Sequence, residues 1–156
     1  MIKRQLFRQL EEKIEPNKAV ILYGPRRVGK TTILKMLAEK LKEKERVKFL
    51  NGENLETQQA LSSQSIEKLR EYIGDSSLLI IDEAQRVDNI GLNLKLIVDN
   101  ISGVKVIASG SASFALAQNV GEPLTGRKKT LCLYPISAKE IISDFGMSHY
   151  LDIFES

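Results

Sequence analysis

Apolar positions along the chain form two kinds of segment, short mainly apolar runs and longer stretches with helical spacing. Short runs at 19–23, 47–50, 78–81, 104–108 and 130–134 predict buried strands. Apolar residues spaced three or four apart predict helices over 3–14, 30–44, 66–73, 90–101 and 111–118, and another helix begins at 137. Strands that alternate with helices indicate an α/β fold, a mainly parallel sheet of five strands flanked by helices.

Two local signals refine these boundaries, and one segment carries no clear signal. Gly74 stands where a helix C-cap is expected, and Ser137 and Glu140 have the spacing of a capping box. Residues 52–63 are polar and match neither periodicity, so they are left unassigned. We expect one domain over 1–156, with an N-terminal helix (1–16), a core (17–145) and a C-terminal tail (146–156).

Composition excludes several classes of protein. The chain has 156 residues, of which 42% are hydrophobic and 28% charged, so disorder and coiled coil fit poorly. One cysteine and one histidine exclude an internal disulfide and a zinc centre built from these residue types. No apolar run approaches the roughly 20 residues of a membrane span, and the N-terminus is charged and amphipathic. We therefore expect a cytoplasmic protein without a membrane partner, and the net charge of +3 is too small to indicate nucleic acid.

The loop after the first predicted strand has the phosphate-loop pattern of Gly, four residues, Gly-Lys-Thr. Its backbone N–H groups and the following helix N-terminus suit phosphate oxygens. We expect Lys30 to reach the β- and γ-phosphates of a nucleotide and the Thr31 hydroxyl to bind Mg²⁺. Accidental spacing is the alternative, and the strand before the loop and the helix after it argue against accident. The expected nucleotide contacts are Gly24, Pro25, Arg26, Arg27, Val28, Gly29, Lys30, Thr31 and Thr32.

The third predicted strand ends in two acids, Asp82 and Glu83. A carboxylate after such a strand suits a Walker-B metal ligand, so we expect Asp82 to hold Mg²⁺. A second carboxylate just beyond it can orient and polarise the water that attacks the γ-phosphate, which is the role expected for Glu83. The alternative is that both acids begin a helix, where acids are favoured.

Three more positions are candidate catalytic residues. The fourth predicted strand runs into Ser109 and Ser111, whose hydroxyls can sense the γ-phosphate or fix the attacking water; an N-cap is the alternative. Arg127 precedes the fifth predicted strand and can stabilise charge in the transition state, in its own chain or in a neighbour's. Its alternative is a solvated surface position beside two lysines. If Arg127 acts in trans, a dimer or ring is required.

With these motifs in order, the chain resembles the nucleotide-binding domain of a prokaryotic AAA-plus-type P-loop ATPase family. Members usually carry a further C-terminal domain of nuclease-like or winged-helix character. The segments that carry the resemblance are GPRRVGKTT (24–32), LLIIDEAQRV (78–87), VIASGSAS (106–113), LTGRKKTLCLYPISAKEI (124–141) and the leading helix. The chain stops at Ser156, where relatives continue. We therefore do not expect an activity of that domain here, although the resemblance suggests protein partners and DNA association.

The resemblance implies a P-loop NTPase sheet with strand order 5-1-4-3-2, in which the fourth strand lies between those leading to Lys30 and Asp82. It also implies ATP or ADP with Mg²⁺ as ligands, Ser109 or Ser111 as a sensor, and Arg127 as a sensor or finger.

Two functions follow. The first is an Mg²⁺-dependent ATPase whose nucleotide state is coupled to a partner or DNA; the alternative is a nucleotide-dependent switch with little hydrolysis. A small-molecule kinase stays open, whereas the Asn-Lys-x-Asp segment of a GTPase is missing after the third strand.

Overall fold

The computed structural model describes residues 5–111, 123–137 and 140. Within these residues lie five strands, five α-helices and one 3-10 helix. They are, in chain order, α1 (Gln5–Glu12), β1 (Lys18–Tyr23), α2 (Lys30–Leu41), β2 (Val47–Asn51), α3 (Leu55–Leu61), α4 (Ile66–Ile73), β3 (Leu78–Asp82), η1 (Ala84–Arg86), α5 (Ile90–Asn100), β4 (Lys105–Gly110) and β5 (Lys128–Cys132). The helix predicted over 111–118, the body of the helix from 137 and the tail lie outside the described residues.

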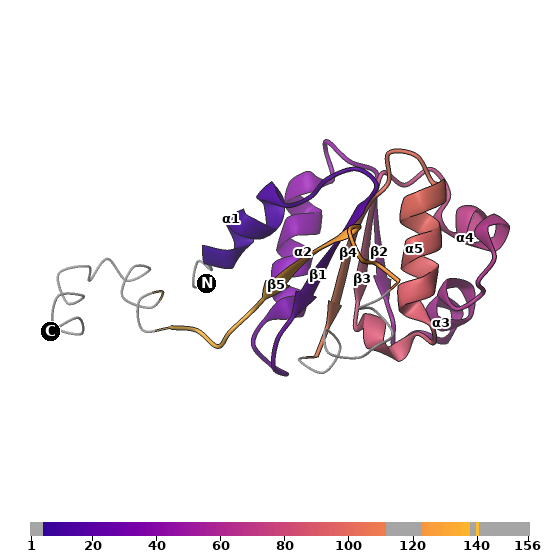
Figure 1. Cartoon of the computed structure of the whole chain (residues 1–156). Coiled ribbons are helices and arrows are strands. Elements are labelled where there is room, and N and C mark those ends of the chain that lie inside the picture. Colours follow the sequence, from indigo (N-terminus) through magenta and orange to yellow (C-terminus); the bar gives the residue numbers. More distant parts are fainter. Residues whose placement is uncertain (1–4, 112–122, 138–139, 141–156) are drawn as a thin grey trace, which may run out of the picture.

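The five strands form one sheet in the order β2-β3-β4-β1-β5, which is the predicted order. All of the four strand pairings are parallel. Figure 1 shows α1 and α2 on one side of this sheet and α3, α4 and α5 on the other. Because parallel strands end at the same edge, the loops after β1, β3 and β4 lie next to one another. The α/β prediction is therefore confirmed, and the predicted site residues after these strands share one edge.

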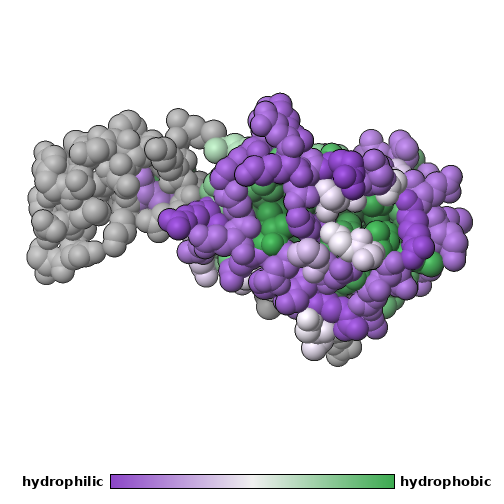
Figure 2. Space-filling model, turned by 90° about the horizontal axis from the view of Figure 1, so that it is seen from above, coloured by the Kyte–Doolittle hydropathy of each residue, from purple (hydrophilic) through white to green (hydrophobic). Residues whose placement is uncertain are grey.

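Strands that are buried on both sides are apolar throughout, so each face of the sheet packs against its own apolar core. Every residue of β3 is buried. On the α1 and α2 side, Val20 and Leu22 pack with Leu34 and Leu37. On the other side, Ile21 belongs to a cluster with residues of α3, α4 and α5. Figure 2, seen from above Figure 1 at the amino-terminal ends of the strands, shows polar residues over most of that face, with apolar residues visible between them.

Two stretches differ from the sequence prediction. The unassigned polar segment contains α3, whose N-cap Asn54 accepts a hydrogen bond from the Thr57 amide at 3.3 Å. Only Thr57 and Leu61 are buried in this helix, so an apolar periodicity is missing. The fifth strand begins at Lys128, two residues before the predicted start, because backbone pairing with β1 at the sheet edge needs no apolar side chain.

The predicted helix-end signals are confirmed where the structure describes them. Gly74 is the C-cap of α4 with φ 65°, and its amide donates to Arg70 O. The Glu140 amide donates to Ser137 Oγ at 3.2 Å, and Glu140 Oε2 accepts from the Ser137 amide at 3.0 Å. This reciprocal pair is a capping box. No helix of the described residues has the length and apolar character needed to cross a membrane.

Glu45 joins three elements at the amino-terminal edge of the sheet and carries a pH prediction. Its carboxylate accepts hydrogen bonds from Lys105 Nζ, at the start of β4, and from Ser77 Oγ at 2.6 Å. Partial burial raises the pKa of Glu45, but the bonds from Lys105 and Ser77 outweigh this, so the pKa lies below its ordinary value of 4.5. The ionised carboxylate therefore stabilises the fold above that pH, and this stabilisation is lost as pH falls through the folded-state pKa.

We expect Glu45→Gln to lower the free energy of unfolding by about 1–2 kcal/mol at neutral pH. The difference from wild type should shrink below pH 4.5, the unfolded value, as wild-type Glu45 becomes protonated. Urea unfolding at several pH values measures both quantities. Glu39→Gln is the matched control, because Glu39 pairs with Lys42 at an exposed position and is expected to change stability by less than about 0.5 kcal/mol. A pH-independent loss at Glu45 would contradict the ionic account.

Candidate functional site

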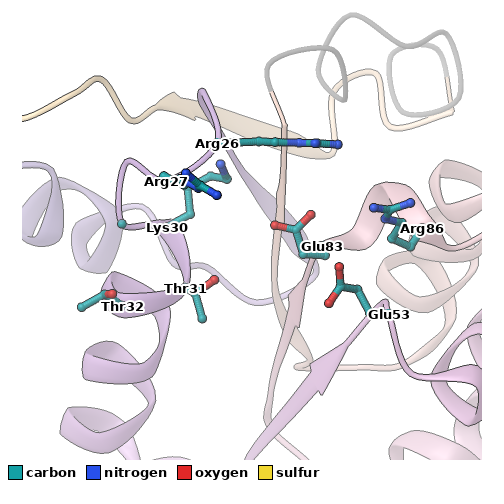
Figure 3. Close-up of a pocket in the computed structure, with 9 residues that line it drawn as sticks. Arg26, Arg27, Lys30, Thr31, Thr32, Glu53, Glu83 and Arg86 are labelled. Carbon is teal, nitrogen blue, oxygen red and sulfur yellow. The ribbon is translucent and has the colours of Figure 1, made fainter.

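A polar cavity of about 500 Å³ opens at the carboxyl-terminal edge of the sheet. Figure 3 shows the phosphate loop and the start of α2 on one side, with Lys30 and Thr31, and Glu53, Glu83 and Arg86 on the other. The residues that line it are Arg26, Arg27, Gly29, Lys30, Thr31, Thr32, Glu53, Glu83 and Arg86. Six of the predicted nucleotide contacts are therefore in one cavity with the predicted catalytic carboxylate.

The phosphate loop turns sharply into α2 through residues with left-handed backbones. Arg27 and Gly29 have left-handed backbones, with φ of 63° and 98°, which turns the chain sharply before α2. No side chain caps α2, and its first intrahelical bond runs from the Ile33 amide to Gly29 O at 3.0 Å. The preceding amides, from Lys30 to Thr32, are therefore left without intrahelical acceptors. Such a helix start favours an anion.

Lys30 is a buried cation without an acidic partner. Its side chain is part of a residue only 5% exposed, and its ammonium donates to Gly24 O at 2.9 Å and Pro25 O at 2.7 Å. No ion pair of the described residues includes it. A buried charge is costly unless it is paired. The loop therefore holds an uncompensated positive charge at the place where the sequence predicts phosphates.

The other residues of the loop differ in position. Gly24 is buried against Leu133, and Val28 packs on the apolar cluster beneath α2. Pro25 is exposed and contributes its carbonyl to Lys30. Figure 3 shows Arg26 extended across the mouth of the cavity and Arg27 beside Lys30. Both arginines are exposed.

Asp82 is the centre of a hydrogen-bond network that joins the ends of β3 and β4 to the start of α2. It is 4% exposed, and its Oδ2 accepts from Thr31 Oγ1 at 2.6 Å. Its Oδ1 accepts from Ser109 Oγ, and the same hydroxyl oxygen accepts from the Glu83 amide at 3.3 Å. The structure therefore brings together the two predicted metal ligands, Thr31 and Asp82, through a direct contact.

The donor set fits Mg²⁺. This ion prefers oxygen ligands and is usually held by one or two protein groups, with phosphate oxygens and water completing its shell. Thr31 and Asp82 offer a hydroxyl and a buried carboxylate that has no cationic partner among the described residues. In the part of the chain that the structure describes, no group of three or more His, Cys, Asp or Glu side chains could hold a metal.

Glu83 has a left-handed backbone, with φ 53° and ψ 40°. A short helix does follow, since Glu83 is the N-cap of η1, but its side chain makes no capping hydrogen bond. Figure 3 shows the carboxylate directed into the cavity instead, facing the side that carries Lys30 and Thr31. Its Oε2 accepts a hydrogen bond from Gln85 Nε2. The helix-start alternative explains the position of Glu83 but not the direction of its side chain.

The two predicted serines occupy different places. Ser109 is fully buried inside β4 and bonds to Asp82 and Glu83, so it is not an N-cap. Ser111 follows β4 and is half-buried, and the helix it was predicted to cap lies outside the described residues. The hydroxyl of Ser109 thus organises the acidic residues, whereas contact with phosphate stays a prediction for both serines.

Arg127 is not brought to the cavity of its own chain. Its carbonyl accepts from the Ala19 amide at 2.9 Å at the beginning of β1, whereas the phosphate loop follows Tyr23 at the other end of that strand. Four residues of strand separate the two ends by about 13 Å. The Arg127 guanidinium pairs with Asp99 at the end of α5. A role in trans stays a prediction.

Two cavity residues were missed by the sequence analysis, Glu53 and Arg86. Glu53 lies in the loop after β2, and the rule that ligands bind beyond strand ends would have included this loop. Arg86 is in η1, within the segment 78–87 that carried the family resemblance. Neither side chain forms a hydrogen bond or ion pair with another described residue.

The chain is similar to known proteins over most of its length. A family model described as AAA domain matches residues 16–142. An uncharacterized protein of Methanocaldococcus jannaschii is 30% identical over 141 residues, which cover 86% of this chain and 30% of that protein. A proteasome-associated ATPase of Nakamurella multipartita is 34% identical over 97 residues, covering 60% of this chain and 16% of that protein.

A solved structure has the same fold. The crystal structure of a DNA replication initiation factor matches 97% of this chain and 50% of its own, with a TM-score of 0.62 and 14% identity. At this identity the match shows the fold alone. The chain spans less than a third of the length of the curated relatives described above.

Proposed function

The chain belongs to the AAA domain family, and from this premise we propose that it binds Mg²⁺-ATP in the phosphate-loop cavity and hydrolyses it. As an AAA-type P-loop ATPase domain it binds nucleotide; the magnesium requirement, the hydrolysis and the residue roles are the proposal. Measurements of nucleotide binding and of phosphate release also decide the alternative, a nucleotide-dependent switch with little hydrolysis.

The observation that carries the proposal is the buried ammonium of Lys30. Lys30 as a whole residue is 5% exposed, and its ammonium donates to two carbonyl oxygens of its own loop. Carbonyl oxygens satisfy its hydrogen-bond donors but do not neutralise its charge. Phosphate oxygens beside the uncapped start of α2 would do both. The Arg26 and Arg27 side chains at the cavity mouth add positive charge on the same side.

Thr31 and Asp82 would hold the magnesium ion. The bound ion would neutralise negative charge that develops on the phosphates. Asp82 is kept in place for this role by Ser109 Oγ, which bonds the carboxylate oxygen that Thr31 does not contact. A preorganised ligand loses less entropy on binding.

Glu83 would prepare the attacking water. Its carboxylate faces the phosphate-loop side of the cavity and can accept a hydrogen bond from water there. The water oxygen forms a bond to the γ-phosphorus while the bond to the β–γ bridging oxygen breaks, giving ADP and inorganic phosphate. A positioned carboxylate orients the water and takes up its proton.

Calorimetric titration of the protein with ATP, ADP and GTP in the presence of Mg²⁺ tests the binding step. We expect Lys30→Ala to weaken ATP binding by roughly 10- to 100-fold, because a charge-assisted contact to phosphate is lost. Lys35→Ala is the matched control, since Lys35 is an exposed lysine of the same helix outside the cavity. Equal ATP affinity of wild type and Lys30→Ala would overturn the placement of the phosphates at Lys30 in this cavity.

Coupling to a partner is a further part of the proposal. The relatives are longer than this chain, so a protein partner or a C-terminal domain is the expected recipient of the nucleotide signal. DNA association remains a prediction from the family resemblance, supported only by a fold shared with a DNA replication initiation factor. Sedimentation of the protein with and without ATP tests the oligomer that an Arg127 acting in trans requires.

A further inference from the structure

Gln85 makes one side-chain hydrogen bond among the described residues, and that bond is with the proposed catalytic carboxylate. Its Nε2 donates to Glu83 Oε2. Its Oε1 is buried and accepts no hydrogen bond, and it is the one side-chain atom of this kind among the described residues. A buried acceptor without a partner is costly and calls for an explanation.

The orientation of the Gln85 amide follows from the carboxylate. If the amide were turned over, Oε1 would face Glu83 Oε2 and two acceptors would meet without a proton between them. In that orientation the Gln85 amide would also offer no N–H donor to the Glu83 carboxylate. The contact to Glu83 therefore fixes the amide, at the expense of the unsatisfied Oε1.

The backbone of Glu83 is held independently of Gln85. The Glu83 amide donates to Ser109 Oγ at 3.3 Å, and Glu83 O accepts from the Arg86 amide at 3.0 Å. The left-handed conformation of this residue, which is unfavourable for a non-glycine residue, is thus maintained by its surroundings. These backbone bonds do not hold the rotation of the Glu83 side chain. Among the described residues, the hydrogen bond to its carboxylate comes from Gln85.

We propose that Gln85 is a positioning residue that holds the Glu83 carboxylate toward the cavity, with Oε2 engaged and Oε1 of Glu83 left to accept the attacking water. The inference rests on the proposed ATP hydrolysis. Orientation of a general base lowers the barrier only if its direction is fixed before the reaction. Gln85 acts through Glu83 and need not touch nucleotide, since it is not among the residues that line the cavity.

Steady-state ATP hydrolysis by four proteins tests this role: wild type, Gln85→Ala, Glu83→Gln and the double variant. We expect Gln85→Ala to lower kcat by roughly 10- to 100-fold and to change KM by less than about threefold. In the Glu83→Gln background, Gln85→Ala should have no further effect, because the group it positions is gone. Gln59→Ala, an exposed glutamine on α3 away from the cavity, should match wild type.

Two activity results would overturn the positioning role. One is an equal fractional loss of kcat in both backgrounds, which indicates a structural effect independent of Glu83. The other is an unchanged or increased kcat, which indicates that Gln85 is not needed or restrains Glu83 away from the water. Equal binding of a non-hydrolysable ATP analogue by wild type and Gln85→Ala is expected, and a large loss of that binding would also count against the role.

A second measurement separates this inference from the proposed function. If the wild type binds ATP without hydrolysing it, the hydrolysis proposal fails, and the urea unfolding midpoints of Glu83→Ala, Gln85→Ala and their double variant still test the contact. A double-variant shift smaller than the sum of the single shifts supports a direct Glu83–Gln85 interaction in the free protein. Additive shifts would overturn it.

Discussion

Replacing Glu83 with glutamine is expected to lower the rate of ATP hydrolysis by about 100- to 10,000-fold while ATP affinity stays nearly constant. Glutamine keeps the size of the side chain and one acceptor oxygen, but it cannot take up a proton from water. The carboxylate is not part of the Thr31–Asp82 contact, so binding of the triphosphate and its metal ion should persist. Phosphate release under saturating ATP measures the rate, and calorimetric titration measures the affinity.

A second carboxylate in the cavity provides a control for the Glu83→Gln result. Glu53 faces the same space from the loop after β2, so Glu53→Gln removes one negative charge from the same cavity. We expect it to change the hydrolysis rate by less than about threefold, because no hydrogen bond orients its carboxylate among the described residues. If Glu53→Gln abolished hydrolysis while Glu83→Gln did not, the base would be Glu53 and the present assignment would be wrong.

The sheet was predictable because its strands are buried on both faces. Runs such as 78–81 are apolar without interruption, and only a strand covered by helices on both sides needs that composition. The edge was less well predicted. The first residues of β5 are lysines that pair with β1 through the backbone, and an edge strand places no demand on those side chains. Strand order came from the family resemblance, since local patterns carry no information on which strands are neighbours.

The residues of the candidate site also fall into those whose position could be predicted from sequence and those whose position could not. The sequence predicted that the phosphate loop lies beside Asp82 and Glu83, because residue types and spacing suited to phosphate and metal binding follow two strands of one parallel sheet. Gln85 and Arg86 follow in a turn whose direction depends on the left-handed backbone of Glu83, which sequence does not reveal. Arg127 shows the opposite case, since its charge suggested a role that its position at the amino end of β5 does not support within one chain.

The hydrogen bonds around Asp82 link these separate motifs into one connected group. Ser109 on β4 contacts both Asp82 and the Glu83 amide, and β4 lies between β1 and β3 in the sheet. The central strand therefore fixes the acids relative to the phosphate loop that follows β1. A site built on strand ends is held more precisely than one built on loops alone.

Gly24→Ala is expected to abolish measurable ATP binding and to lower the free energy of unfolding by about 3 kcal/mol. A Cβ at this position would lie 2.1 Å from Leu133 O and 3.1 Å from Leu133 C, both backbone atoms. Leu133 cannot easily give way, because its amide donates to Tyr23 O at 2.7 Å. The phosphate loop must then move away from β5, which displaces the Gly24 and Pro25 carbonyls that hold Lys30.

A second glycine distinguishes this clash from general backbone strain. Gly103 precedes β4 at the amino-terminal edge of the sheet and has φ 78°, and a Cβ added there would meet no atom within 4 Å. Gly103→Ala should therefore cost about 1–2 kcal/mol through its left-handed backbone and leave ATP affinity unchanged. Urea unfolding and calorimetric titration of both variants separate the two effects. Normal ATP binding by a folded Gly24→Ala protein would show that the loop reaches its binding conformation without the close approach to Leu133, and would remove the link between β5 and the nucleotide site.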